Sequence, residues 1–414
     1  MKRFLFVVPP LVGHINPLLG VADELTLRGH RVAWAGSAEQ LYELAGADAV
    51  VFDCPMPPGG LVRPPKLTGP AAFRFLWEDF FLPLAELMAP GIDSAIEAFG
   101  PDVIVSDQHA VAGSLVAARK GVPYVTSATT SAELTDPLAA MPKVGAWLTG
   151  LLDSLRARIG DPGDSADPRF SPHGVIAFTG RALLGDAPLP HDRVRLVGPA
   201  IAPRVSRSDF PWAALDPRRR KVLVSLGTAN VDAGARFLAE AVTALDGMKD
   251  RVQAVVVDPG GALPRQDTGQ DGEYPDLLIR AHVPQLDLLA HMDAVVCHGG
   301  HNTVCESLWH GVPLVIAPIR DDQPIVAGQV VDAGAGVRVR FNRVDAVRLG
   351  AAIDSVLDPA GPHRSTAEAI GRSFREAGGV AAAADQLDEI AARHSFPPHP
   401  RSKPEDSAHV QTAG

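Results

Sequence analysis

Short apolar runs of strand length alternate with longer helical patterns from the first residue to about residue 395. Runs that are apolar on both faces, each followed by a helical pattern, are typical of βαβ units, in which helices cover both faces of a parallel sheet. The alternation therefore predicts an α/β fold. The expected strands are 4–8, 31–35, 50–52, 103–106 and 124–126, and then 222–226, 252–257, 277–279, 294–297 and 314–317.

The alternation lapses between residues 198 and 220, where proline, glycine and a charged run replace it. A chain of 414 residues is long enough for two or three domains, each with its own core. Two Rossmann-like domains with a cleft between them are the simplest arrangement. The expected divisions are an N-terminal domain 1–200, a linker 201–214, a C-terminal domain 215–380, a closing helix 381–395 and a disordered polar tail 396–414.

Two long segments interrupt the regular pattern of the first half, at residues 55–80 and 130–190. Both are rich in proline and apolar side chains, and we expect irregular structure in them. Long loops in compact domains are more often functional than idle, so these segments are expected to form the wall of a pocket. The same apolar side chains could equally belong to an ordinary core.

Charge and cysteine content exclude several classes of protein. The chain has 38 Lys and Arg against 48 Asp and Glu, and a net charge of −10 repels nucleic acid. No apolar stretch approaches the ~18 residues that a membrane-spanning helix needs. Three cysteines cannot form a disulfide framework and fit a reducing compartment. We expect a cytoplasmic protein that has no nucleic-acid partner and no transmembrane segment.

The common nucleotide and nucleophile motifs are missing from the sequence. No G-x-G-x-x-G follows the first strand, no G-x-x-x-x-G-K-[ST] occurs, and Ser225 lacks the glycine that a nucleophile elbow requires. Dehydrogenase, P-loop and α/β-hydrolase functions therefore lose support.

The densest chemistry lies in residues 282–323. The strand that ends at Cys297 is followed by His298, Gly299 and Gly300, and Asn302 or Thr303 then begins a helix. Such a helix start offers free N–H groups and partial positive charge to a phosphate. Thr303 and Glu306 could instead form a capping box that needs no ligand.

A metal site is the third interpretation of this cluster. Cys297, His298, His301 and Cys305 carry zinc-ligand atoms, but their spacing does not match the usual zinc patterns. Two adjacent glycines also suit a phosphate better than a ligand scaffold. We therefore expect no metal.

The segment 282–323, together with residues 9–31, resembles the donor-binding signature of family 1 glycosyltransferases, which have the GT-B fold and use nucleotide sugars. The resemblance implies a fold of two Rossmann-like domains whose parallel sheets face a central cleft. It also implies that the last helix crosses back to the first domain. The nucleotide sugar, linked to UDP or dTDP, is a substrate, so no cofactor is expected.

The resemblance also assigns roles to residues of the donor side. It implies that His298, Gly299, Gly300, Asn302, Thr303 and Thr228 contact the diphosphate, Glu306 the ribose, Asp322 and Gln323 the sugar, and His282, Val283 and Gln285 the base. His282 stands where the family often has Trp, so base stacking would depend on a smaller ring. The choice between uridine and thymidine stays open.

His14 and Asp107 are the candidate catalytic pair. His14 follows the first strand, and Asp107 lies just past the strand at 103–106, so both are expected at the carboxyl edge of one sheet. Imidazole suits proton acceptance at neutral pH, and a carboxylate can orient it. Either residue alone would more often be structural, as His30 is expected to be. The resemblance implies a His-Asp dyad at these positions.

Together these features predict an inverting, metal-independent glycosyltransferase of bacterial secondary metabolism, such as antibiotic biosynthesis. It would move a hexose or deoxyhexose to a small, largely apolar acceptor through oxygen or nitrogen. A sugar-nucleotide epimerase of GT-B shape and a non-catalytic sugar-nucleotide-binding protein are the alternatives. The sequence identifies neither the acceptor nor the oligomeric state.

Overall fold

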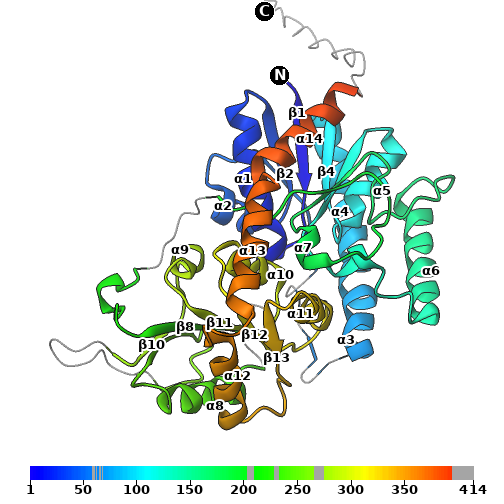
Figure 1. The fold of residues 1–414 in the computed structure, drawn as a ribbon. Helices are drawn as coiled ribbons and strands as arrows, with labels where there is room; N and C mark the ends of the chain where they lie inside the picture. The colour runs from blue at the N-terminus through cyan, green and yellow to red at the C-terminus, as the bar shows by residue number, and fades with distance from the viewer. Residues whose placement is uncertain are drawn as a thin grey trace, which may run out of the picture.

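The computed structural model describes residues 1–57, 61, 63–64, 67, 69–202, 209–227, 233–264 and 275–393. Its two sheets are parallel throughout and are covered by helices on both faces, which confirms the predicted α/β class (Figure 1). We call the part of the chain that carries strands β1–β7 the first lobe, and the part that carries β8–β13 the second lobe.

The first sheet has the strand order β3-β2-β1-β4-β5-β6-β7. Its central strands are apolar on both sides because helices cover both faces, and Phe4, Leu5, Phe6 and Val7 of β1 are fully buried. The strands are β1 Arg3–Val7, β2 Arg31–Gly36, β3 Val51–Asp53, β4 Val103–Asp107, β5 Tyr124–Ala128, β6 Val175–Ala177 and β7 Val194–Leu196. Its helices are α1 Val12–Leu27, α2 Ala38–Ala45, α3 Gly69–Phe75, α4 Leu82–Phe99, α5 Val111–Lys120, α6 Pro142–Ile159 and α7 Arg181–Leu184.

The second sheet has the order β10-β9-β8-β11-β12-β13. Its strands are β8 Arg220–Ser225, β9 Val252–Val257, β10 Leu277–Arg280, β11 Ala294–Cys297, β12 Leu314–Ile316 and β13 Gly336–Arg338. Its helices are α8 Ala235–Asp246, α9 Gln285–Leu289, α10 His301–Trp309, α11 Gln323–Asp332, α12 Ala346–Leu357 and α13 His363–Glu376. The strand order reverses beside β8 and β11, the position at which open α/β sheets bind ligands.

The long segments of the first lobe are more regular than the sequence suggested. Within 130–190 the 18-residue helix α6 forms, and its buried face is Leu148, Leu152, Leu155 and Ile159. In the other segment α3 continues into a short π-helix, η1, at Leu76–Phe81. The expectation of irregular structure was therefore wrong for these parts, because an apolar stripe at helical spacing outweighed the flanking prolines.

The last helix, α14 (Gly379–Arg393), leaves the second lobe and packs along α1 of the first (Figure 1). Arg28 at the end of α1 donates to Asp385 at 2.8 Å and to Asp388 at 3.0 Å. The buried face of α14, which includes Leu387 and Ile390, joins the core around β1. The divisions expected from the sequence stay predictions, and residues 203–208 and the tail from 394 onward lie outside the described residues.

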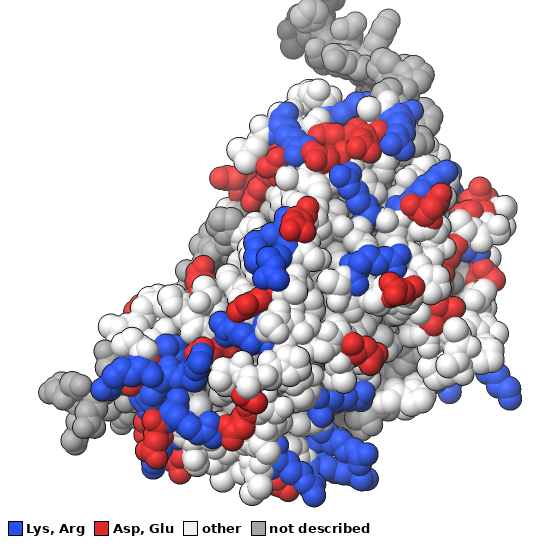
Figure 2. Space-filling view, viewed as in Figure 1, with Lys and Arg blue, Asp and Glu red and all other residues white. Residues whose placement is uncertain are grey.

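Both signs of charge are interspersed on the face shown in Figure 2. Many charged side chains of the described residues are paired, as Arg119 and Lys120 are with Asp93. Among the described helices, none combines the length and apolar character that crossing a bilayer requires.

Candidate active site between the two lobes

A cavity of about 1740 Å³ lies between the lobes and is lined by both of them. The carboxyl ends of β1, β4 and β5 lead into one wall, and the loops after β11 and β12 lead into the other. The cavity is lined by nine of the residues to which the sequence assigned catalytic or donor-binding roles, namely His14, Gln285, His298, Gly300, Asn302, Thr303, Glu306, Asp322 and Gln323.

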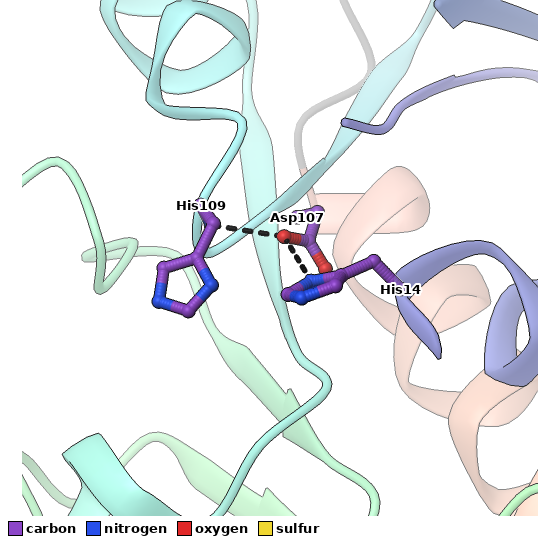
Figure 3. Close-up of side chains that lie close together, drawn as sticks. All are labelled: His14, Asp107 and His109. Carbon is purple, nitrogen blue, oxygen red and sulfur yellow. Dashed lines mark hydrogen bonds and ion pairs between the residues drawn. The ribbon is translucent and has the colours of Figure 1, made fainter. Parts of the chain in front are cut away.

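His14 and Asp107 meet at the edge of the first sheet (Figure 3). Nδ1 of His14 lies 2.9 Å from Oδ1 of Asp107, which is the last residue of β4 and is fully buried. Because a carboxylate only accepts, Nδ1 carries the proton and Nε2 keeps its lone pair. Thr129, just after β5, donates its hydroxyl to Oδ2 of Asp107 at 2.8 Å and accepts from Nδ1 of His14 at 2.8 Å. The arrangement fixes the tautomer that a proton acceptor needs.

The Asp107 carboxyl stays ionised in this setting. Burial alone raises its pKa, but the charges of His14 and His109 and the hydrogen bonds from both residues lower the pKa below the ordinary value. The backbone N–H of His109 is one of these donors, at 2.9 Å from Oδ1. An ionised Asp107 can stabilise the cation that forms when His14 accepts a proton.

Helix α1 contains a proline that local preference would place at its start. A proline after asparagine, as Pro17 after Asn16, is typical of the first position of a helix. Helix α1 nevertheless starts at Val12, so His14 lies in its first turn and Pro17 in its interior. Proline has no N–H, so the carbonyl of Gly13, four residues before Pro17, has no helical donor. That carbonyl accepts Nδ2 of Asn302 from the second lobe at 2.8 Å. Pro17 thus leaves a carbonyl open for a bond between the lobes.

The opposite wall is a strand–turn–helix unit in which β11 ends at Cys297 and α10 starts at His301. Gly299 has a φ of +90°, a backbone conformation that glycine adopts without strain. Gly300 caps α10, and no side chain of the described residues bonds the cap. Thr303 and Glu306 lie inside the helix rather than at its cap, so the capping-box interpretation was wrong. The first N–H groups of α10 are free of a side-chain cap and suit an anion.

The ring of His298 is packed tightly against this turn. A Cβ on Gly300 would lie 2.4 Å from Nε2 of His298, and one on Gly227 would lie 2.7 Å from its Cε1. Burial lowers the pKa of His298 to about 4, and Arg320 adds to the effect. The imidazole is therefore neutral at pH 7 and offers a hydrogen bond rather than a charge.

Glu306 and the pair Asp322–Gln323 bring polar groups into the same cavity. Glu306 accepts Nε2 of Gln285 at 2.8 Å. Asp322 precedes α11, and its Oδ2 accepts the hydroxyl of Thr130 from the first lobe at 2.6 Å. Burial raises the pKa of the Asp322 carboxyl, and the bond from Thr130 opposes that rise. Gln323 folds back and accepts from the backbone N–H of Ile319 at 2.9 Å.

Some predicted residues are absent from the wall of the cavity. His282 is exposed outside it, and Val283 packs into the core of the second lobe. Gly299 shapes the turn without lining the cavity, because its α-carbon faces Ile316 and the carbonyl of Gln323. Thr228 lies outside the described residues.

The ligand atoms of Cys297, His298, His301 and Cys305 are not gathered in one place within the described part of the chain. Cys297 and Cys305 lie in the apolar core, and burial raises the pKa of the Cys297 thiol to about 12. His301 instead bonds the carbonyl of Phe178 in the first lobe at 3.1 Å. Ligand-type atoms do gather at His14, Asp107 and His109, where Nδ1 of His14 and both oxygens of Asp107 take part in the hydrogen bonds described above.

Sequence reasoning missed the residues that join the two walls. Thr129 and Thr130 follow β5, which pairs with β4, so strand order was the signal that could have found them. Arg63 forms a two-pronged ion pair with Asp321, both contacts at 2.7 Å, across the cavity. His109 and Glu133 also line the cavity and are bonded to each other at 3.0 Å. No sequence pattern connects residues so far apart.

Comparisons with known proteins agree with this geometry. Residues 252–376 match the family model of the C-terminal domain of erythromycin biosynthesis protein CIII-like proteins. The chain is 29% identical over 420 residues to demethyllactenocin mycarosyltransferase of Streptomyces fradiae, covering 94% of this chain and 87% of that protein. It is 28% identical to YojK of Bacillus subtilis, an uncharacterized UDP-glucosyltransferase, covering 94% of this chain and 97% of that protein.

A solved structure, the glycotransferase of kitacinnamycin, superposes with a TM-score of 0.76 at 27% identity and covers 94% of this chain and 99% of its own. The similarity thus extends over both lobes and over the cavity between them. These similarities support the resemblance to family 1 glycosyltransferases found in the sequence: the chain has the GT-B fold, and it is an enzyme of glycosyl transfer.

Proposed function

We propose that the enzyme transfers a hexose or deoxyhexose from a UDP- or dTDP-sugar to a small, largely apolar natural product, through oxygen or nitrogen and with inversion. The observation that carries the proposal is that one cavity has a carboxylate-oriented imidazole on one wall. The other wall has a helix start without a side-chain cap, beside carboxylates that can accept from sugar hydroxyls. The name of one relative, a UDP-glucosyltransferase, supports a nucleotide-linked sugar, and the name of the other, a mycarosyltransferase, supports glycosyl transfer.

The donor would bind to the second lobe. The diphosphate would accept hydrogen bonds from the first N–H groups of α10 and from His298, while Glu306 would accept from the ribose hydroxyls. Asp322 and Gln323 would bind the sugar. The side-chain amide of Asn302 donates to the carbonyl of Gly13, so its contribution to the diphosphate site would come from its backbone N–H.

The reaction would be a single displacement. Nε2 of His14 removes the proton from the acceptor as its oxygen or nitrogen attacks the anomeric carbon, and the bond from that carbon to the diphosphate breaks. The acceptor attacks from the first lobe and the leaving group departs towards the second, so the anomeric configuration inverts. The leaving diphosphate takes the electron pair and is stabilised by the helix start and the neutral His298. No metal or cofactor is required.

The acceptor would occupy the part of the cavity in the first lobe. Its wall there is largely apolar and includes Leu61, Phe73, Leu76, Trp77, Phe81 and Leu134. Several of these side chains also belong to the core, so both of the roles considered from sequence apply to them. The apolar wall favours an aromatic or polyketide-like acceptor.

Calorimetric titration of the full chain with a panel of UDP- and dTDP-sugars, and with UDP and dTDP alone, tests the donor class. We expect one nucleotide series to bind, with added affinity from the sugar that depends on Asp322. Proton NMR of the product then reads the anomeric configuration. A retained configuration, or binding by neither series, would contradict the proposal. The cytoplasmic location stays a prediction of the sequence.

A further inference from the structure

His109 is a second imidazole in the active site that the reaction as proposed does not use. It follows β4 by two residues, is 8% exposed and lines the cavity. Its ring centroid lies 5.1 Å from that of His14, and ligand-type atoms of His14, Asp107 and His109 all lie within 4.8 Å of one another. Figure 3 shows the His109 ring turned towards the other two side chains.

One edge of the His109 ring is held by a buried ion-pair chain. Nε2 lies 3.0 Å from Oε1 of Glu133, so this nitrogen carries a proton. Arg169 lies 3.3 Å from the other oxygen of Glu133 and is paired with Asp167 at 2.7 Å. The charges alternate in sign from one ion pair to the next. The side chains of Glu133 and Arg169 are only 12% and 16% exposed.

The other edge of the ring decides its charge. Nδ1 is buried and has no hydrogen-bond partner among the residues that the structure describes. In a neutral ring this atom would be a lone pair close to the negative Asp107, whereas in a charged ring it is an N–H in an attractive field. The ring also stacks on Phe81, with centroids 4.6 Å apart, and a cation gains from an aromatic face. The geometry therefore favours the charged form.

The charged groups that surround His109 agree. Burial lowers its pKa, but Glu133, Asp107 and Asp322 raise it by more, so the pKa lies above the ordinary value. The charges of Arg169 and His109 in turn outweigh the burial of Glu133 and lower the pKa of that carboxyl to about 2. The cation Arg169 is bonded to the far oxygen of Glu133, and His14 is bonded to Asp107.

We propose that His109 is a charged positioning residue that lowers the basicity of His14 and so suits the enzyme to acceptors with acidic hydroxyls, such as phenols and enols, rather than alkanols. This inference rests on the proposed role of His14 as the base. A weaker base accepts a proton readily only from a more acidic group. The pKa of a phenol, about 10, lies far below that of water, about 15.7. The same fixed charge stabilises the oxyanion that develops during attack.

NMR of the free enzyme with ¹³C-labelled histidine tests the charge without any substrate. We expect the His109 resonance, identified by its loss in His109→Gln, to titrate above the ordinary histidine pKa. The His14 resonance should titrate about one pH unit higher in His109→Gln and in Glu133→Gln than in the wild type. A neutral His109 at pH 7, or a His14 titration that both variants leave unchanged, would overturn the inference.

Kinetics add the test of acceptor class. In both variants the acidic limb of kcat/KM should move to higher pH, and the preference for a phenol over a matched benzyl alcohol should fall about tenfold. Glu97→Gln is the matched control, because Glu97 is a carboxylate of the same lobe paired with Lys120 on the surface. Glu133→Asp keeps the charge and should keep the wild-type profile. It therefore separates the loss of charge from poor folding of Glu133→Gln.

A preference for the phenol that both variants leave unchanged would also overturn the inference. Absence of transfer to any acceptor, with the NMR result as expected, would instead contradict the proposed function. The two failures are therefore distinguishable.

Discussion

The two walls of the cavity are built in different ways. The wall of the second lobe comes largely from one stretch of chain, residues 285–325, in which a strand, two glycines and a helix follow one another directly. The wall of the first lobe collects single residues from segments far apart, as the hydrogen bonds of His14 to Asp107 and Thr129 show, 93 and 115 positions away. One wall is local in sequence and the other depends on strand order.

This difference matters for chemistry as well as for recognition. A local unit presents backbone N–H groups, which are the same whatever the side chains are, and so suits the invariant diphosphate. An assembled wall can change one side chain at a time, and so suits acceptors that vary. We therefore expect substitutions in the first lobe to change the rate and the choice of acceptor, and substitutions in the second to change donor affinity.

His14→Ala should give the largest effect and the clearest separation of the walls. Removing the base should lower kcat by about 10³-fold, in the range usual for a general base, while calorimetric affinity for the nucleotide sugar changes little. His30→Ala is a matched control. His30 accepts from the backbone N–H of Lys2 and pairs with the carboxylate of Asp388, and neither contact is at the cavity. It should lower thermal stability and leave the rate unchanged. Full activity of His14→Ala would remove His14 from the mechanism.

Gly300→Ala should act on the other wall. The backbone at Gly300, with φ −62°, accepts alanine, but the new Cβ would lie 2.4 Å from Nε2 of His298 and displace that ring. We expect donor affinity to fall about tenfold by calorimetry, with little change in acceptor KM. Gly350→Ala in α12 is the control, since its Cβ would meet only Met248 at 4.0 Å. Unchanged donor affinity would contradict the assignment of His298 to the diphosphate.

The wall of the second lobe could be predicted from the sequence more completely than the wall of the first lobe. The strand–glycine–helix unit at 294–309 could be predicted from its own residues, apart from the first residue of α10. The edge of the first sheet suggested that His14 and Asp107 could meet, because parallel strands end together. Nothing in the sequence around Thr129, Thr130 or Glu133 distinguishes them from ordinary loop residues. Their function depends on which strand lies beside which.

Pro17 shows how a local signal can mislead. A proline after asparagine is typical of the first position of a helix, yet here the helix had already begun. The cost of an interior proline is offset because the carbonyl that it leaves open bonds Asn302 from the other lobe. Helix α6 was missed for a similar reason, because nearby prolines and glycines hid its apolar stripe. In both cases tertiary contacts outweighed local preference.

Thr130→Val should have a moderate effect, because Thr130 joins the walls. The substitution keeps the shape but removes the hydroxyl that donates to Asp322 at 2.6 Å. We expect kcat/KM to fall about tenfold while affinity for the free nucleoside diphosphate is unchanged. Loss of this bond also raises the pKa of Asp322 further, so activity should begin to fall at a higher pH as the solution is acidified.

Thr243→Val is the control for Thr130→Val. The Thr243 hydroxyl bonds only the carbonyl of Ala239 within α8, on the exposed surface. Both variants replace a threonine with an isosteric side chain, but only Thr130 reaches across the cavity. An equal loss of activity in the two variants would show that the contact between Thr130 and Asp322 does not position the donor.

Chelation should give the smallest effect. It tests whether the residues of the two walls suffice for glycosyl transfer without a metal ion. Asp107 accepts from His14, Thr129 and the backbone N–H of His109, so a metal there would have to displace the bonds that orient the base. On the donor side, the proposed function has the diphosphate charge met by the N–H groups at the start of α10 rather than by a metal ion. Transfer measured with and without excess EDTA should therefore agree within experimental error. Complete loss that zinc or magnesium restores would mean that a cation, rather than the start of α10, neutralises the leaving group.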